Sequence, residues 1–265
     1  MFLSPGRSAA AVFMLLAFGL AAQAAESVGD ARRIVNSVTG AGVVGNRSLA
    51  ATDPVYRDEA ITAAETSRGE LQLQDGSRII VGENSTISLD DFVVGGSGFK
   101  SGTINVAKGA FRFISGGSAK EAIRIKTPLA TIGVRGTVLD VYVEPGSGVT
   151  RTVLINGRIT ACNNAGECRT ATRACDIILV PSTSEIEQLP FLRSARRSRG
   201  EEASLFTLTE DQSRFSRQWR AFEGGCSARA ADEVREGLPE NATGSNAPPT
   251  PPGGGNDDDD DCGEC

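Results

Sequence analysis

The apolar residues of segment 126–146, KTPLATIGVRGTVLDVYVEPG, alternate with polar ones, but the alternation changes phase part-way along. Successive side chains of a β-strand point to opposite faces, so one regular strand buries residues of one phase only. The apolar positions, first even-numbered and then odd-numbered, are Ile132, Val134, Leu139, Val141 and Val143. A chain that buries all of them on one side must insert an extra residue between the two sets.

We interpret the residues between the two sets as a β-bulge or corner made by Gly133, Arg135, Gly136 and Thr137. Gly136 would adopt a backbone angle that other residues avoid, and the bend would turn both apolar sets toward one core. Arg135 has two interpretations that stay open here. Its guanidinium either caps carbonyl groups that the bulge leaves unpaired, or binds a partner's carboxylate through its bidentate fork.

Short alternating runs, each ended by a turn signal, fill the chain from about residue 40 to residue 181. Asp75-Gly76 stands between two such runs and predicts a hairpin, and Asn156-Gly157 predicts a second one. No amphipathic helix long enough for a βαβ crossover interrupts the runs. The pattern predicts an all-β fold, either a twisted β-solenoid-like roll or a sandwich.

The two ends of the chain have a different character from this β region. Residues 1–24 combine Arg7, an apolar run and a small-x-small Ala22-Gln23-Ala24 site, which is typical of a secretory signal peptide. An uncleaved anchor is the alternative, but the apolar run is short for a membrane span of about 20 residues. Cleavage would change the formal charge from −6 to −7, because the removed residues hold one arginine and no acid.

The remaining boundaries follow from composition. Residues 25–39 are interpreted as a lead-in segment, 40–182 as the β domain, and 183–236 as an extension with a helix at about 209–223. In that helix Phe215, Trp219 and Phe222 recur at helical spacing, so the aromatic stripe either packs on its own domain or docks a partner. Residues 237–265 are rich in proline, glycine and aspartate and are predicted to be a disordered acidic tail.

The cysteines are expected to form disulfides, because an exported chain meets an oxidising compartment and this one has no histidine to favour zinc. A bridge between Cys162 and Cys168 across a hairpin loop is the first expectation, with Cys168–Cys175 and Cys162–Cys175 as open alternatives. One of the three would pair with Cys226 and tie the extension to the β domain. The remaining two are expected to form a terminal disulfide; they are Cys262 and Cys265.

Three motifs together resemble the FecR domain family: the DGS hairpin, the G-x-F strand GAF, and the segment TPLATIGVRGT, over about residues 40–181. This family is best known as the periplasmic portion of iron-transport sigma-factor regulators. The resemblance implies an all-β roll or sandwich that contacts another protein, such as the signalling domain of an outer-membrane TonB-dependent transporter. Here residues 1–24 lead almost directly into the domain, so we expect no anti-sigma segment and no direct route to a sigma factor.

We therefore predict a non-enzymatic protein-interaction or signal-sensing module in the periplasm of a Gram-negative bacterium, or secreted from one. We predict no catalytic residue, no cofactor and no metal site. The partner would be another envelope protein such as a transporter, sensor or adhesin. The acidic balance argues against nucleic acid, and after signal cleavage we expect no stable membrane insertion.

Two other functions remain as alternatives at this point. One is an envelope or surface structural protein that binds glycan or a copy of itself. The less favoured one is a β-solenoid polysaccharide lyase or hydrolase. The adjacent carboxylates Asp90 and Asp91 would point to opposite faces of a strand, so they do not form an acid/base pair.

Overall fold

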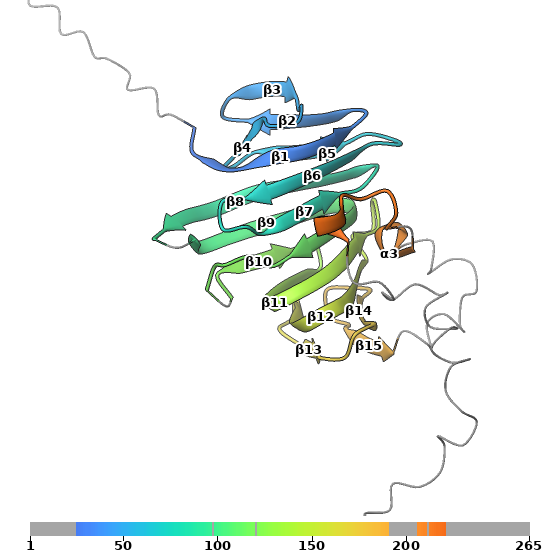
Figure 1. Cartoon of the computed structure of the whole chain (residues 1–265). Helices are drawn as coiled ribbons and strands as arrows, with labels where there is room; N and C mark the ends of the chain where they lie inside the picture. The colour runs from blue at the N-terminus through green and yellow to red at the C-terminus, as the bar shows by residue number, and fades with distance from the viewer. Residues whose placement is uncertain (1–24, 97, 120, 191–205, 211, 221–265) are drawn as a thin grey trace, which may run out of the picture.

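The computed structural model describes residues 25–96, 98–119, 121–190, 206–210 and 212–220, and these residues are mostly β-structure (Figure 1). The strands are β1 Ser27–Val35, β2 Val38–Gly42, β3 Gly45–Ser48, β4 Pro54–Tyr56, β5 Ala60–Ala63, β6 Arg68–Leu73, β7 Arg78–Val81, β8 Ser85–Gly95, β9 Gly98–Ile114, β10 Ile123–Lys126, β11 Ala130–Val143, β12 Thr150–Asn163, β13 Cys168–Ala171, β14 Asp176–Val180 and β15 Glu187–Pro190. A helical turn, α3 (Thr207–Glu210), and a 3-10 turn, η1 (Arg217–Trp219), follow. Within the described ranges no helix is both long and apolar enough to span a membrane.

All the strands belong to one hydrogen-bonded sheet, and strand β9 is its branch point. The first part of β9 pairs with β8 and β10, and its last part pairs with β7 and β11. The sheet therefore has two arms. The β7 arm contains β15, β14, β7, β6, β1 and β4, and the β10 arm contains β13, β10, β8, β5, β2 and β3. Strands β9, β11 and β12 run through both.

The two arms share one hydrophobic core. Alternate residues of the β7 arm, such as Leu71 and Phe113, belong to the same buried cluster as Ile87 and Ile125 of the β10 arm. This cluster includes both sets of apolar residues that flank the change of phase, from Ile132 to Val143. The sheet thus folds over on itself, and each arm keeps an inner face toward the core and an outer face away from it.

Glycines lie where β11 and β12 pass from one arm to the other. Gly136 has a φ of 59° and Gly157 a φ of 90°, in the left-handed region that favours glycine. The β11–β12 register shifts between Arg135 and Val138, which is the extra residue that the change of phase requires. A Cβ atom on Gly157 would overlap the carbonyl oxygen of Gly136, so the two corners are stacked against each other.

Two details of the predicted turns are wrong. Asn156-Gly157 does not form a hairpin, because β12 continues from Thr150 to Asn163 and these residues lie at its corner opposite β11. Gly133 is not part of the corner but lies in the regular ladder, opposite Thr160 and Arg124. The Asp75-Gly76 hairpin is present between β6 and β7, with Gly76 at a φ of 80°.

The β-structure also extends beyond the predicted boundaries. Strand β1, within the predicted lead-in segment, pairs with β4 and β6 and is part of the sheet, and β15 lies beyond residue 182. The predicted helix 209–223 is wrong over its described part: α3 ends at Glu210, residues 212–216 form no helix, and η1 is a single turn. The reason is that sheet side chains, rather than helical hydrogen bonds, hold its backbone carbonyl groups. The predicted signal peptide and the predicted acidic tail lie outside the described residues.

Candidate functional site

The outer face of the β7 arm is covered by the segment comprising residues 206–210 and 212–220, which we call the strap (Figure 1). Beneath the strap, residues from successive strands stand opposite one another in one row across the sheet. The row consists of Arg33, Glu70, Ile80, Arg112, Asp140, Val153 and Ile177. The strap packs Phe206 on the Val153 end of this row and Phe215 and Trp219 on Ile80.

A fully buried ion pair occupies the middle of the row. The Arg112 side chain is 0% exposed and that of Asp140 is 2% exposed. The guanidinium donates two parallel hydrogen bonds to the carboxylate, Nε to Oδ1 at 2.6 Å and Nη2 to Oδ2 at 2.7 Å. Such a pair is favourable in the interior only if its other hydrogen-bonding groups are also satisfied.

The strap supplies those remaining partners. Arg112 donates through Nη2 to the carbonyl oxygen of Leu208 at 2.9 Å and through Nη1 to Oε1 of Gln212 at 2.8 Å. Thr209 donates from its hydroxyl to Oδ2 of Asp140 at 2.5 Å. The pair is thus committed to holding the strap and has no free atom aimed at a cavity, so its chemistry is structural.

A second anchor holds the strap near β6. Arg68 and Arg33 both donate to the carbonyl oxygen of Arg214, at 2.7 and 3.2 Å, and Oε1 of buried Glu70 accepts the backbone N–H of Ser216 at 3.2 Å. The guanidinium groups of Arg68 and Arg112 lie 5.0 and 5.5 Å from the centre of the Phe215 ring, within cation–π range. Sheet arginines therefore bind strap carbonyl groups, while the strap aromatics fill the space between them.

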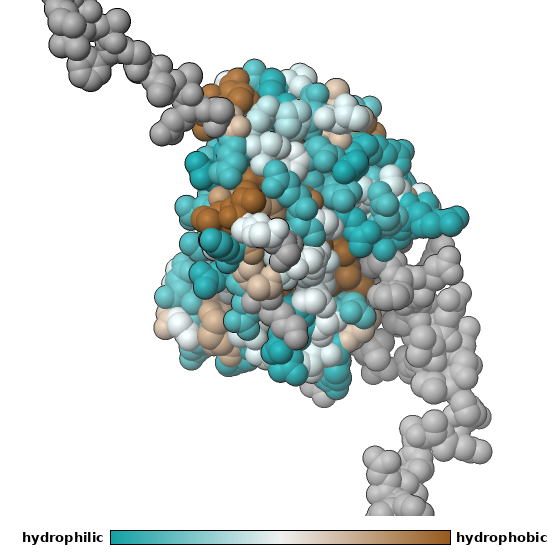
Figure 2. Space-filling view, turned by 60° about the vertical axis from the view of Figure 1, so that its left-hand side comes forward, coloured by the Kyte–Doolittle hydropathy of each residue, from teal (hydrophilic) through white to brown (hydrophobic). Residues whose placement is uncertain are grey.

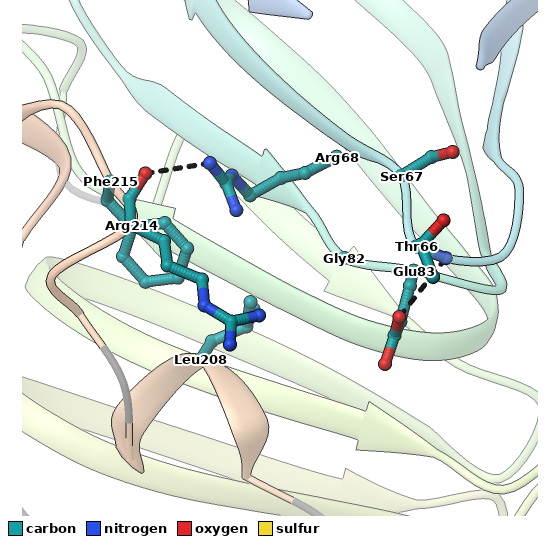
Figure 3. A pocket seen from close by; sticks show the side chains of 8 residues that line it. All are labelled: Thr66, Ser67, Arg68, Gly82, Glu83, Leu208, Arg214 and Phe215. Atoms are coloured by element: carbon teal, nitrogen blue, oxygen red, sulfur yellow. Dashed lines mark hydrogen bonds between the residues drawn. The ribbon is translucent and has the colours of Figure 1, made fainter. Parts of the chain in front are cut away.

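A pocket of about 170 Å³ remains at the edge of the strap (Figure 3). Figure 3 shows Arg68 reaching the backbone of Arg214 on one side and Glu83 bonded to the backbone of Thr66 on the other. A second pocket of about 190 Å³ lies beside the β11 corner, where Asp75 already accepts hydrogen bonds from Ser77 and Ser118. Both volumes are below the range of a typical small-molecule site.

In the corner of β11, Thr137 rather than Arg135 caps the backbone groups of the bulge. The hydroxyl of Thr137 accepts a hydrogen bond from the backbone N–H of Arg135 and donates one to the carbonyl oxygen of Arg158, both at 2.8 Å. The backbone N–H of Thr137 donates to Oγ of Ser115 at 2.9 Å. Thr137 therefore caps the bulge, whereas the side chain of Arg135 is exposed and has no bond with any described residue. The capping interpretation of Arg135 is wrong.

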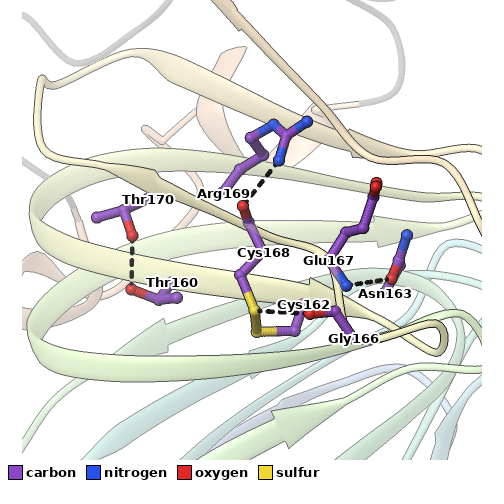
Figure 4. Close-up of a disulfide and its surroundings, with 8 residues drawn as sticks. All are labelled: Thr160, Cys162, Asn163, Gly166, Glu167, Cys168, Arg169 and Thr170. Atoms are coloured by element: carbon purple, nitrogen blue, oxygen red, sulfur yellow. Dashed lines mark hydrogen bonds between the residues drawn. A yellow bond between two sulfur atoms is a disulfide. The ribbon is translucent and has the colours of Figure 1, made fainter.

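The predicted bridge between Cys162 and Cys168 is confirmed (Figure 4). The two residues stand opposite each other on β12 and β13, and the neighbouring pair Thr160 and Thr170 shares a hydrogen bond of 2.9 Å. Cys175 is also disulfide-bonded, and its partner lies outside the described residues. The alternatives Cys162–Cys175 and Cys168–Cys175 are therefore wrong, while the predictions for Cys226, Cys262 and Cys265 lie outside the described residues.

The aromatic stripe of the extension packs on its own domain. Phe215 is 3% exposed and Trp219 is 1% exposed, both against the β7 arm, so neither is available to dock a partner in this conformation. Phe222 lies outside the described residues. Of the ranges that the structure describes, none brings three metal-ligating side chains together.

The exposed surface offers little apolar area. On the face drawn in Figure 2, hydrophilic residues cover most of the surface and apolar residues gather in a few small areas. Among the described residues, the exposed large hydrophobic side chains lie at the β2–β3 turn and near the end of β8; they are Val43, Val44, Val93 and Val94.

The buried ion pair that holds the strap could not be identified from the sequence. Arg112 stands between two core phenylalanines and Asp140 between two core aliphatic residues, so the alternation places both on an outer face. That signal shows a charged residue pointing away from the core. It does not show that the two residues face each other or that the strap covers them.

The bulge of β11, which lets the sheet fold over on itself, lies at the end of the TPLATIGVRGT segment. Residues 59–160 match the family model described as FecR protein. The chain carries a FecR domain. The match extends from the start of β5 into β12, so the FecR domain contains the corner of β11 but neither β1–β4 nor the strap. A search of curated proteins gives no match.

Solved structures similar to this chain include two of proteins described as a "putative anti-sigma factor" from Parabacteroides distasonis. One has 13% identity and a TM-score of 0.41, and the match covers 49% of this chain and 59% of the other. The second has 12% identity and a TM-score of 0.42, and the match covers 67% of this chain and 90% of the other. A third structure, described as a cell surface anchoring domain, has 22% identity, a TM-score of 0.24 and coverage of 25% and 88%. This chain thus spans somewhat over half the length of the first of these structures.

Proposed function

We propose that this protein is an exported, non-enzymatic module whose sheet forms a FecR-type roll, and that it binds another protein of the bacterial envelope to sense or relay a signal. The observation that carries the proposal is the FecR domain at residues 59–160. Proteins of this family are regulators that act through protein contacts and are typically not enzymes.

The properties of the described residues agree with this proposal. Arg112 and Asp140, the most deeply buried charged pair, use their hydrogen-bonding groups to fix the strap rather than to face a substrate. The pockets are small, and several of their polar side chains already form hydrogen bonds within the protein. A stiff, disulfide-linked β-scaffold with polar outer surface suits a protein that holds a binding surface in place. The signal-like residues 1–24 support export.

The first experiment tests export. The full chain with a C-terminal tag is produced in a Gram-negative host, and the periplasmic fraction is analysed by N-terminal sequencing. We expect a mature protein that begins at Ala25, because Ala22-Gln23-Ala24 forms the cleavage site. Cytoplasmic protein that retains residues 1–24 would contradict the proposal.

The second experiment tests protein binding in the native organism. The tagged full chain is cross-linked in intact cells and purified from the envelope, and its covalent adducts are identified by mass spectrometry. We expect reproducible adducts with one envelope protein, formed through residues of the FecR domain. As a control, an unrelated exported β-protein is tagged and cross-linked in the same way. If it gives the same adducts in equal amounts, the contacts are nonspecific and the proposal is overturned.

A further inference from the structure

The outer face of the β10 arm differs from that of the β7 arm because its cationic side chains are exposed. Inner residues such as Ile125, Ile132 and Ala161 stand opposite one another and are buried, so the residues that alternate with them face outward. The outward positions include four basic residues, all exposed: Arg124, Lys126, Arg135 and Arg158. We call these four residues the basic face.

The cations of the basic face have no acidic partner among the described residues. None of the four forms an ion pair or a side-chain hydrogen bond with any described residue, although most arginines of the β7 arm do. The nearest acid along the row that contains Arg124 is Asp90, with Thr103 of β9 standing between them. Asp90 is already bonded by Asn105 and Ser88. In a chain of formal charge −6, this cluster of unpaired cations is a local reversal of sign.

Two of these arginines stand directly opposite each other. Arg135 and Arg158 form a cross-strand pair of the β11–β12 ladder, an arrangement that is unfavourable for like charges. Thr137 holds the pair in place, since its hydroxyl bonds to the backbone of both residues. The backbones of two arginines are therefore held opposite each other at the corner, and repulsion between their guanidinium groups is relieved when an anion lies between them.

The chemistry of the face selects the type of anion. Arginine side chains form bidentate hydrogen bonds with carboxylates, and Gly133 leaves the sheet open between Arg124 and Thr160. Single-stranded nucleic acids bind largely by stacking their bases on aromatic rings. The aromatic side chains of the described residues are buried or lie away from this face, since Tyr56 is on β4 and Tyr142 packs beneath the strap, so the face offers no such ring.

We infer that the basic face is the docking surface for a carboxylate-rich segment of a partner protein, with Arg135 and Arg158 as its central contacts. The inference rests on the proposed function, because it names the surface and the partner chemistry of that protein contact. An acidic segment neutralises the Arg135–Arg158 repulsion and extends toward Arg124 and Lys126 across β11.

The test measures binding of a fluorescein-labelled peptide of alternating glutamate and serine to the full mature chain by fluorescence anisotropy. The matched peptide has glutamine in place of glutamate. We expect saturable binding of the acidic peptide, weakened by added salt, and none of the glutamine peptide. The double variant Arg135→Gln/Arg158→Gln should raise the Kd at least about tenfold.

A control double variant removes the same charge from elsewhere. Arg32 and Arg217 are exposed residues of β1 and the strap, and Arg32→Gln/Arg217→Gln should change the Kd less than about twofold, because charges beyond a Debye length are screened. Thermal melting shows that each variant is folded. The Arg135→Gln/Arg158→Gln variant should melt no lower than the parent, because the substitution removes a like-charge pair.

Four outcomes would overturn the inference. Equal loss of binding in both double variants would mean that net charge, not this face, binds the peptide. Binding of polygalacturonate but not of the acidic peptide would assign the face to a glycan. Peptide binding that emerges only when residues 257–261 are all changed to asparagine would assign the face to the chain's own acidic segment. If the envelope adducts persist in Arg135→Gln/Arg158→Gln, the proposed function stands and the assignment of this face fails.

Discussion

The two outer faces of the sheet share the same long strands, but the strap buries one of them and the other is exposed. On the β7 arm, outward residues such as Ile80 and the Arg112–Asp140 pair are buried beneath the strap. On the β10 arm, outward residues such as Arg135 and Arg158 are exposed and unpaired with any described residue. The comparison shows that β9, β11 and β12 carry two different surfaces on either side of their corners.

The difference has a physical basis in the charges. On the β7 arm Arg33 stands opposite Glu70 and Arg112 opposite Asp140, so these charges are paired and the face can be covered by a segment that supplies backbone carbonyl groups. On the β10 arm like charges face each other, so a neutral cover would bury uncompensated cations. A face of that kind is stable in water or against an acidic partner.

The largest effect is expected from breaking the buried pair under the strap. Asp140→Ala leaves the Arg112 guanidinium buried without its carboxylate, and the free energy of unfolding should fall by about 3–5 kcal/mol. Urea denaturation measures the loss. Replacing both residues by apolar ones, Arg112→Met/Asp140→Leu, should recover much of the stability. A double variant as unstable as Asp140→Ala would mean that the pair is not the origin of the loss.

A slightly smaller effect is expected from detaching the strap itself. Trp219→Ala removes a side chain that is 1% exposed and should lower the free energy of unfolding by about 3 kcal/mol. Relative to the parent, amide hydrogen exchange should become faster in the strap and change less in the sheet. Arg217→Ala, an exposed neighbour in the same turn, should stay within about 0.5 kcal/mol of the parent. Uniformly faster exchange over both arms would contradict a separate, face-covering role of the strap.

Effects of intermediate size are expected from substituting the glycines of the two corners that join the arms, and the two substitutions should differ. Gly157→Ala adds a Cβ atom that overlaps the backbone of Gly136, in addition to its positive φ, and should destabilise the protein by about 2–3 kcal/mol. Gly136→Ala meets no atom within 4 Å and carries only the cost of its positive φ, about 1 kcal/mol. Thermal denaturation of both variants gives the order. The reverse order would show that φ strain outweighs the contact between the corners.

The smallest effect is expected from changing the Arg135–Arg158 pair of the basic face. Arg158→Glu converts the Arg135–Arg158 pair into one of opposite charge and should stabilise the protein by about 0.5 kcal/mol at low salt. The gain should shrink as salt screens the pair. Differential scanning calorimetry at two salt concentrations measures it. Destabilisation at low salt would mean that the two side chains do not interact across the ladder.

Local features of the sequence predicted much of the β-architecture. The change of phase between Val134 and Leu139 required a bulge, and a bulge with a positive φ at Gly136 lies there. Asp75-Gly76 predicted the β6–β7 hairpin, and Cys162 and Cys168 predicted their bridge. These features depend on the period of a strand and on the angles that glycine allows, both of which are properties of a short stretch of chain.

The same reasoning failed where distant segments decide the outcome. Asn156-Gly157 has the composition of a hairpin turn, yet its place opposite the β11 corner makes it part of a continuous bent strand. The aromatic spacing of Phe215 and Trp219 suggested a helix, yet sheet arginines bind the carbonyl group of Arg214, just before Phe215, and the segment is not helical there.

By itself the sequence determined which residues turn inward, where a strand must bend and which residues carry charge on the outer side. The tertiary structure alone decided which charges meet: Arg112 with Asp140 under the strap, and Arg135 with Arg158 in the open. The alternation of inward and outward residues is a property of each strand's own sequence. Register between strands is fixed by packing of the whole core, and a shift of two positions would exchange partners while keeping every side chain on its own face.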